Sequence, residues 1–330
     1  MKSKNLIVFD MDGVIMDVSK SYRDTVRHTT KLFLSPAPSA ARMPEPLFDL
    51  SDLAGVKQSG GLNNDWDLSF QTISLMFTLI KKPDVHDTED PWSTYRKTLS
   101  LCDLSKLADY LNSTDRPLMN LLNQHGKLAD PLIAKFYAGD VGSGNIIKQI
   151  FQEIYLGEEL FTSTYGLTPE IYRGQGYILR ETVMTSSLIL DELSRKNHLA
   201  IATGRPRAEA EYPLEHFKLK GYFDIVYSLD DCLKEEKRIH DEEGKEVSLS
   251  KPHPYMLDAI AEKYNDAATT FYYVGDMPDD IVAAGRSRFG YKSIGMLISA
   301  PDKRRLKDEF VRAGADYIVD DFEGLKQIIL

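Results

Sequence analysis

The sequence has few cysteines, no long hydrophobic run and no excess of basic residues, and each shortage argues against a class of protein. Its 330 residues include only two cysteines, Cys102 and Cys232, far apart and without metal-ligand spacing. This argues against a disulfide scaffold and a cysteine zinc site, and it favours a reducing cytoplasm. No apolar run approaches the roughly 20 residues that span a bilayer, so we expect no membrane partner.

The charge balance argues against nucleic acid as a partner. The chain has a net charge of −10, whereas general nucleic-acid binding depends on basic surface. A small anionic substrate is still compatible with this charge, because a local cluster of cations can outweigh distant acidic groups.

Short apolar runs that stop at polar residues predict strands near both ends of the chain. Continuous runs of this kind are typical of parallel strands covered on both faces. They occupy residues 6–9, 199–202, 225–227, 271–274, 294–298 and 317–319. Most are followed by a helical pattern, so the sequence predicts an α/β fold with a doubly wound, Rossmann-like parallel sheet.

The alternation of strands and helices disappears in the middle of the chain. Helical stretches separated by proline and glycine take its place, at residues 68–80, 104–111 and 146–155. We interpret residues 34–183 as a mostly helical domain, inserted into an α/β domain formed by residues 1–33 and 184–330. The densely charged segment 234–245 is predicted to be an exposed hairpin or loop.

The first motif with chemical content is Asp10-Met11-Asp12-Gly13-Val14, directly after the first apolar run. A two-residue spacing points both carboxylates the same way if the backbone stays extended. Gly13 allows the turn that follows. The alternative is a strand end followed by acidic loop residues.

Two further motifs offer groups suited to an anion. Thr203-Gly204-Arg205 ends an apolar run, and a hydroxyl with backbone N–H groups at a helix start suits phosphate oxygens. An ordinary threonine helix cap is the alternative. Lys251 precedes a helical pattern, where its ammonium group could reach the site as a point charge. A solvated surface lysine is the alternative.

The fourth motif runs from Val274 to Asp280 and places three carboxylates within five residues, at Asp276, Asp279 and Asp280. Such a cluster is repulsive unless a cation lies among its members. Hard oxygen ligands in small number favour Mg²⁺ over zinc. An acidic first turn of a helix is the alternative for Asp279 and Asp280, and it explains Asp276 less well.

In this order the four motifs resemble those of the haloacid dehalogenase-like superfamily, over residues 1–33 and 184–330. The large insert between the first two motifs resembles the helical cap of the phosphoglycolate phosphatase-like branch. The resemblance implies that Asp10 is the nucleophile that takes a phosphoryl group. It implies that Asp12 protonates the leaving oxygen and then deprotonates the attacking water.

The same resemblance assigns the remaining residues. Thr203, with Gly204 and Arg205, would bind the phosphoryl oxygens, and Lys251 would balance their charge. The implied cofactor is Mg²⁺. Its ligands would come from the first and fourth motifs, namely Asp10, the backbone carbonyl of Asp12, Asp276 and Asp280.

Candidates for substrate contact in the inserted domain are Asn64 and Trp66, in the polar stretch 60–67, and Arg173, close to the return into the α/β domain. A helix cap is the alternative for Asn64. A packing anchor is the alternative for Trp66, and a surface arginine for Arg173.

Together these features predict a cytoplasmic, magnesium-dependent phosphatase that acts on a small phosphorylated metabolite, with a sugar or polyol phosphate as the suggested class. Asp12 favours phosphate-ester chemistry, because the superfamily's dehalogenases lack an acid at this position. A phosphomutase using the same aspartyl-phosphate is the first alternative. A binding protein that has kept the fold without the activity is the second.

Overall fold

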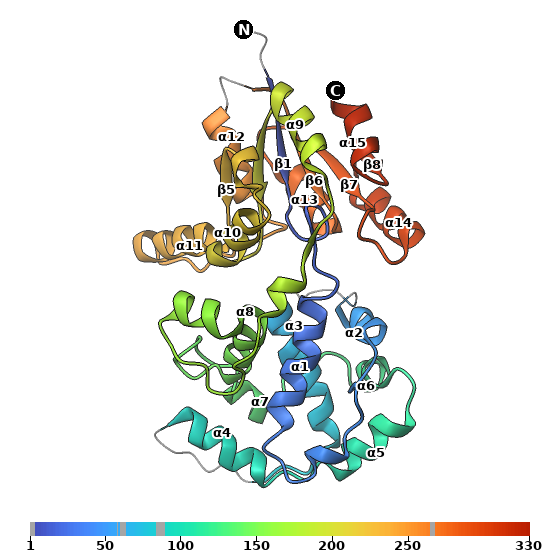
Figure 1. Ribbon diagram of the computed structural model, residues 1–330, viewed down its shortest axis with the longest axis vertical. Coiled ribbons are helices and arrows are strands. Elements are labelled where there is room, and N and C mark those ends of the chain that lie inside the picture. Colours follow the sequence, from blue (N-terminus) through green and yellow to red (C-terminus); the bar gives the residue numbers. More distant parts are fainter. Residues whose placement is uncertain (1–3, 58, 60–63, 84–89, 265–267) are drawn as a thin grey trace. The chain divides into compact units, whose positions relative to one another are not determined.

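The computed structural model describes residues 4–330 except 58, 60–63, 84–89 and 265–267. The chain forms two compact units. An α/β unit comprises Met1–Val18 and Glu181–Leu330, and a helical unit comprises Ser19–Arg180 (Figure 1). The sequence pattern predicts the boundaries after residues 33 and 183, whereas the contacts within the structure divide the chain after residues 18 and 180.

The α/β unit contains a six-stranded sheet in the order β5-β4-β1-β6-β7-β8, in which every neighbouring pair is parallel. Its strands are β1 (Lys4–Phe9), β4 (Asn197–Ala202), β5 (Ile225–Tyr227), β6 (Ala268–Gly275), β7 (Lys292–Met296) and β8 (Tyr317–Val319). Each predicted apolar run lies in or overlaps one of these strands. The predicted doubly wound parallel sheet is therefore confirmed.

Helices cover both faces of this sheet (Figure 1). They are α9 (Ser187–Lys196), α10 (Arg207–His216), α11 (Leu229–Glu243), α12 (Tyr255–Tyr264), α13 (Pro278–Arg286), α14 (Lys303–Ala313) and α15 (Phe322–Ile329), with a short helix η4 (Lys220–Tyr222). Ile7 and Phe9 of β1 belong to one buried apolar cluster, and Leu6 and Val8 belong to another. Because successive strand residues point to opposite faces, this division shows that both faces of β1 are buried.

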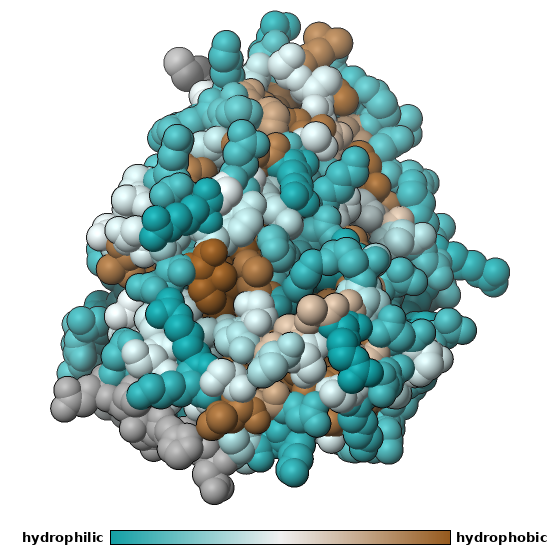
Figure 2. Space-filling model, turned by 60° about the horizontal axis from the view of Figure 1, so that its bottom comes forward, coloured by the Kyte–Doolittle hydropathy of each residue, from teal (hydrophilic) through white to brown (hydrophobic). Residues whose placement is uncertain are grey.

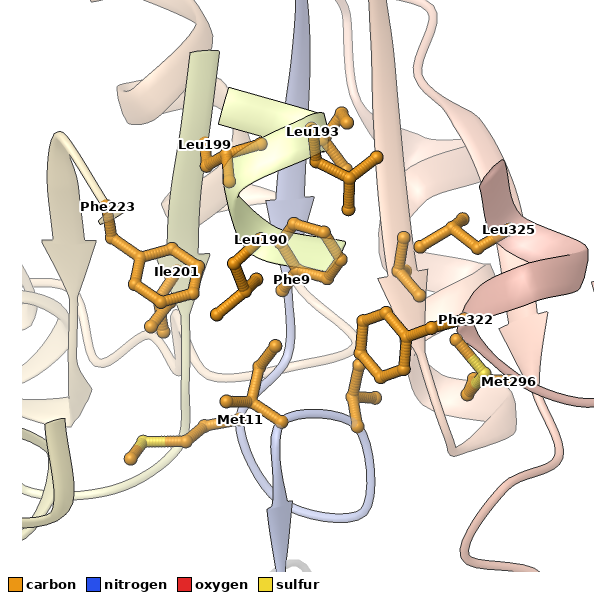
Figure 3. Close-up of a cluster of buried hydrophobic side chains, with 14 of the residues drawn as sticks. Phe9, Met11, Leu190, Leu193, Leu199, Ile201, Phe223, Met296, Phe322 and Leu325 are labelled. Atoms are coloured by element: carbon orange, nitrogen blue, oxygen red, sulfur yellow. The ribbon is translucent and has the colours of Figure 1, made fainter. Parts of the chain in front are cut away.

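The first cluster fixes the strand that carries the Asp-Met-Asp motif. Phe9 lies among Leu190 of α9 and Phe322 and Leu325 of α15 (Figure 3). The rings of Phe9 and Phe322 stack with centroids 6.3 Å apart. This packing holds the end of β1, and Asp10 directly after it, in a rigid position.

A small antiparallel ribbon forms where the α/β unit is interrupted. Strand β2 (Met16–Asp17) pairs with β3 (Thr182–Val183), and the N–H of Met184 donates to the carbonyl of Ile15 at 2.9 Å. The ribbon therefore ties the two chain segments of the unit together beside the first motif.

The helical unit begins with α1 (Tyr22–Leu34), which packs against α3 (Asp65–Met76) and α8 (Ile146–Tyr165). The other described helices are η1 (Ala40–Arg42), α2 (Leu50–Lys57), η2 (Phe77–Leu79), α4 (Pro91–Ser100), α5 (Ser105–Ser113), α6 (Pro117–His125), α7 (Pro131–Lys135) and η3 (Tyr177–Arg180). The helical stretches predicted in this region lie in α3 with η2, in α5 and in α8. Helix α1, which the sequence pattern predicts as part of the α/β domain, belongs to the helical unit.

The prediction of a hairpin or loop at residues 234–245 is wrong. Most of this segment belongs to the helix α11, which ends at Gly244 in the left-handed conformation. Its residues are mostly exposed, as predicted. Ion pairs one turn apart stabilise it, because Arg238 pairs with both Glu235 and Glu242. Ser228 and Asp231 add a capping box at the start of the helix.

Hydrophilic residues predominate on the face shown in Figure 2, with apolar residues in small groups between them. Within the described part of the chain, no helix is both long and apolar enough to cross a bilayer.

Candidate active site

The register of three parallel strands brings the motifs to one edge of the sheet. Phe9 of β1 lies opposite Ile201 of β4 and Val274 of β6. Asp10, Thr203 and Asp276 come shortly after these positions, so all three lie beyond the carboxyl ends of adjacent strands. This edge is where doubly wound sheets bind their ligands.

Three carboxylates converge there. Asp10, Asp276 and Asp280 each offer an oxygen within 4.8 Å of the others. Asp10 and Asp280 are buried and Asp276 is half-buried. Asp10 accepts the N–H of Met11 at 2.8 Å, and the hydroxyl of Ser299 donates to Asp276 at 3.2 Å. The cluster is therefore held in place by the backbone and by the loop after β7.

The charge of this cluster is not fully compensated. Burial raises the pKa of Asp10 to about 7; Lys251 opposes this rise, while Asp280 and Asp12 add to it. Burial, together with Asp10 and Asp280, also raises the pKa of Asp276 well above its ordinary value. A divalent cation among these hard oxygen donors would stabilise their ionised forms, so the donor set fits Mg²⁺ or a similar ion.

Lys251 joins the carboxylates from the loop before α12. Its Nζ lies 2.8 Å from Asp10 and 2.8 Å from Asp280. Burial works to lower the pKa of Lys251, but Asp10 and Asp280 outweigh burial and raise it well above the ordinary value. Lys251 therefore stays positively charged between the two acids.

Tyr273 is a site residue that the sequence analysis missed. This buried side chain on β6 accepts from Lys251 at 3.2 Å, and its hydroxyl donates to Asp280 at 2.9 Å. No sequence signal distinguishes it from the apolar residues around it. Ser299 was also missed, because it lies beyond the four motifs.

The fourth motif separates its two adjacent acids. Asp280 is buried, and it accepts the N–H of Met277 at 3.0 Å in the first turn of α13. A Cβ on Gly275 would lie 2.2 Å from the Cβ of Asp280, so only glycine admits this side chain. Asp279 is exposed. Asp280, and not its neighbour, belongs to the cluster.

Asp12 lies on a tight loop after β1. Gly13 has φ +70°, and its N–H donates to the carbonyl of Met16 at 2.8 Å. A Cβ on Gly13 would lie 2.0 Å from a carboxylate oxygen of Asp276, so the loop needs glycine to approach the cluster. The side chain of Asp12 is 34% exposed and pairs with Arg205.

The second motif places a hydroxyl and an arginine in different surroundings. Thr203 is buried, its N–H donates to the carbonyl of Tyr227 at 3.0 Å, and its hydroxyl accepts the N–H of Arg205 at 3.2 Å. Among the described residues no acceptor is found for the hydroxyl proton of Thr203, so this hydroxyl can donate to an anion. Arg205 is buried among protein groups, whereas Gly204 is exposed.

The candidates from the inserted domain lie in the helical unit. Asn64 caps α3, where its side chain accepts the N–H of Asp67 at 2.7 Å. Trp66 packs under Lys148, whose Nζ lies 4.4 Å from the ring centroid. Arg173 is exposed. Residues 60–63 of the polar stretch lie outside the described residues.

Part of the chain matches a known protein family. Residues 185–287 match the family model of the haloacid dehalogenase-like hydrolases. Among curated proteins, none matches the chain.

Solved structures with a similar fold cover almost the whole chain. A structural genomics target is 20% identical, with 98% of each chain covered and a TM-score of 0.66. A phosphatase from Thermococcus thioreducens is 16% identical, with 93% of this chain and 99% of that chain covered and a TM-score of 0.52. At such identities the likeness shows a shared fold.

Proposed function

We propose that this chain, whose residues 185–287 match the family model of the haloacid dehalogenase-like hydrolases, is a magnesium-dependent phosphatase of small phosphorylated molecules. The observation that carries the proposal is the convergence of Asp10, Asp276 and Asp280 within 4.8 Å, with the Nζ of Lys251 2.8 Å from Asp10. The Thermococcus structure, which is called a phosphatase, agrees with this function.

Asp10 is the proposed nucleophile. Its carboxylate would attack the phosphorus and form an aspartyl-phosphate, which water then hydrolyses. Lys251 would balance the charge that Asp10 shares with the phosphoryl group, and the Thr203 hydroxyl would donate to a phosphoryl oxygen. Phosphoryl transfer depends mainly on such positioning and charge neutralisation.

Asp12 is the proposed general acid and base. It would protonate the leaving oxygen in the first step and take a proton from water in the second. Its position two residues after Asp10, on a loop closed by Gly13, and its partly exposed carboxyl group support this role.

The proposed ligands of Mg²⁺ are Asp10, Asp276 and the backbone carbonyl of Asp12, with Asp280 beside them. The bound ion would supply positive charge to the phosphoryl oxygens. Both oxygens of Asp280 accept protein donors, from Lys251, Tyr273 and Met277. Asp280 is therefore best suited to hold Lys251 in place within the cluster.

The finer class of substrate, a sugar or polyol phosphate, rests on the polar stretch at residues 60–67 and on the resemblance alone. A cytoplasmic location is likewise a proposal. It is supported by Cys102 and Cys232, which are both buried free thiols.

Phosphate release from a panel of metabolite phosphates, measured with Mg²⁺ or with EDTA, tests the function. We expect magnesium-dependent release by the wild type and none by Asp10→Asn. Asp279→Asn is the matched control, because this exposed acid adjoins Asp280 and should leave the activity unchanged. Absence of release from every compound, or equal release by Asp10→Asn, would contradict the proposal. An isomerised product without phosphate release would indicate the mutase.

A further inference from the structure

Arg205 occupies an unusual place for a residue of a phosphate-binding motif. Its side chain is 1% exposed, and its Nε and Nη2 lie 2.7 and 2.5 Å from the same oxygen, Oδ1, of Asp12. Its Nη1 donates to the carbonyl of Glu209 at 3.1 Å. A guanidinium group has five N–H donors, and protein groups already engage most of them. Arg205 is thus poorly placed to bind a phosphate.

Glu181 also holds the guanidinium group of Arg205. Its carboxylate is fully buried and accepts from Nη2 of Arg205 at 2.9 Å. A buried charge is stable only when it is paired and hydrogen-bonded. The buried ion pair of Arg205 and Glu181 therefore fixes one orientation of the guanidinium group. Asp12 is the more exposed partner of the same guanidinium group.

Arg205 holds Asp12 through one carboxylate oxygen. The Nε and Nη2 of Arg205 both contact Oδ1 of Asp12, and within the described part of the chain no hydrogen bond to Oδ2 of Asp12 is found. The backbone that follows the Asp12 loop is held separately by the pairing of β2 with β3. Strand β3 begins one residue after Glu181. The side chain is thus anchored at one oxygen while the other is left to exchange a proton.

We infer that Arg205, oriented by Glu181, is the positioning residue of Asp12 and aims its second carboxylate oxygen at the leaving group. This inference rests on the proposed function, because it needs Asp12 to transfer a proton. It assigns to Glu181 a role in the reaction, and it moves Arg205 from substrate binding to the support of the acid and base.

The test compares two phosphate esters that differ in their need for a proton. The nitrophenolate released from nitrophenyl phosphate is a stable anion, whereas the glycerol alkoxide released from glycerol phosphate needs protonation. Each ester is assayed with Mg²⁺ for the wild type, Arg205→Lys and Glu181→Gln. The control is Arg207→Lys, which alters the next arginine along the chain. The Nη2 of Arg207 lies 2.5 Å from Asp231, which is not a member of the carboxylate cluster.

We expect Arg205→Lys to lower kcat on glycerol phosphate about tenfold more than on nitrophenyl phosphate. KM and inhibition by inorganic phosphate should stay unchanged, and Arg207→Lys should behave as the wild type. Glu181→Gln should show the same preference more weakly. If Arg205→Lys does not fold, which a melting curve reveals, Glu181→Gln decides.

Two results would overturn the inference alone while the wild type is active. One is an equal loss on both esters, as expected of a purely structural ion pair. The other is a rise in KM and weaker inhibition by phosphate, as expected of a direct phosphate ligand. A wild type inactive on both esters, and on the metabolite panel, would overturn the proposed function and this inference with it.

Discussion

At the scale of single residues, the site depends on a buried tyrosine that no motif includes. Tyr273 links Lys251 to Asp280 through its hydroxyl group. Tyr273→Phe removes that hydroxyl and keeps the packing of the ring. We expect a loss of about 1–2 kcal/mol in the free energy of unfolding, because hydrogen bonds to charged groups are stronger than neutral ones. We also expect kcat to fall, since Lys251 loses one of its fixed partners.

Urea unfolding and phosphate release measure both effects. The matched control is Tyr272→Phe on the same strand, because Tyr272 faces the other apolar cluster. That variant should keep the activity. Equal losses in the two variants would show that the hydroxyl of Tyr273 has no special role.

A second residue-scale prediction concerns pH and the helical unit. Burial, with Lys31 and Arg180 nearby, lowers the pKa of His28 from 6.5 to about 4. Between pH 6.5 and about 4, His28 binds a proton in the unfolded chain but not in the folded chain. Stability therefore falls as the pH drops from 6.5 towards 4. Because His28 is only half-buried, we expect roughly 1–2 kcal/mol across this window.

Urea unfolding of the wild type and His28→Asn across that window measures this contribution. The variant should lose less stability on acidification than the wild type does. Parallel pH profiles of the two proteins would contradict the assigned pKa.

At the scale of elements, the long helix α8 is interrupted by Gly157, which has φ +74°. A Cβ there would lie 2.2 Å from the backbone nitrogen of Gly176. The segment of residues 170–176 therefore packs closely against α8 at Gly157. Glu153 on the same helix accepts the N–H groups of Glu170, Ile171 and Tyr172. The interruption of α8 at Gly157 therefore makes room for the segment around Gly176, which leads back to the α/β unit.

We expect Gly157→Ala to destabilise the protein by about 2–4 kcal/mol, because strain and a backbone clash add together. Gly166→Ala is the matched control, since Gly166 also has positive φ but has open space around it. It should lose only about 1 kcal/mol. Thermal or urea unfolding of both variants decides, and similar losses would show that the close approach to Gly176 is unimportant.

The same elements show what sequence patterns can predict. The apolar pattern predicted a helix only as far as Tyr155, and the structure interrupts α8 two residues later. The charged segment 234–245 was predicted to be a hairpin or loop because it is densely charged. Its helix is stabilised by local charge pairs and caps, which apolar periodicity does not detect.

At the scale of the molecule, the sheet and its motifs were predictable because each motif directly follows an apolar run. Parallel strands align their ends, so Asp10, Thr203 and Asp276 had to meet. The partners Glu181 and Tyr273 were not predictable, since a buried ion pair or hydroxyl depends on contacts between distant segments. The sequence likewise did not show that α1 belongs to the helical unit, because that depends on its contacts with α3 and α8.

A metal effect on the whole protein follows from the carboxylate cluster. Millimolar Mg²⁺ should raise the melting temperature of the wild type, because an ion that binds only the folded state stabilises it. Asp276→Asn should abolish most of this shift, and Asp279→Asn should retain it. Differential scanning calorimetry of the three proteins with and without Mg²⁺ provides the test. An unchanged melting temperature of the wild type would count against the proposed metal site.

The most direct test of the central claim is mass spectrometry of the acid-quenched enzyme during turnover of a phosphate ester that it hydrolyses. If Asp10 is the nucleophile, a phosphoryl group is found on the peptide that contains Asp10, in the wild type with Mg²⁺ and not in Asp10→Asn. Turnover with no phosphoryl group on that peptide, or with one on another residue, would contradict it.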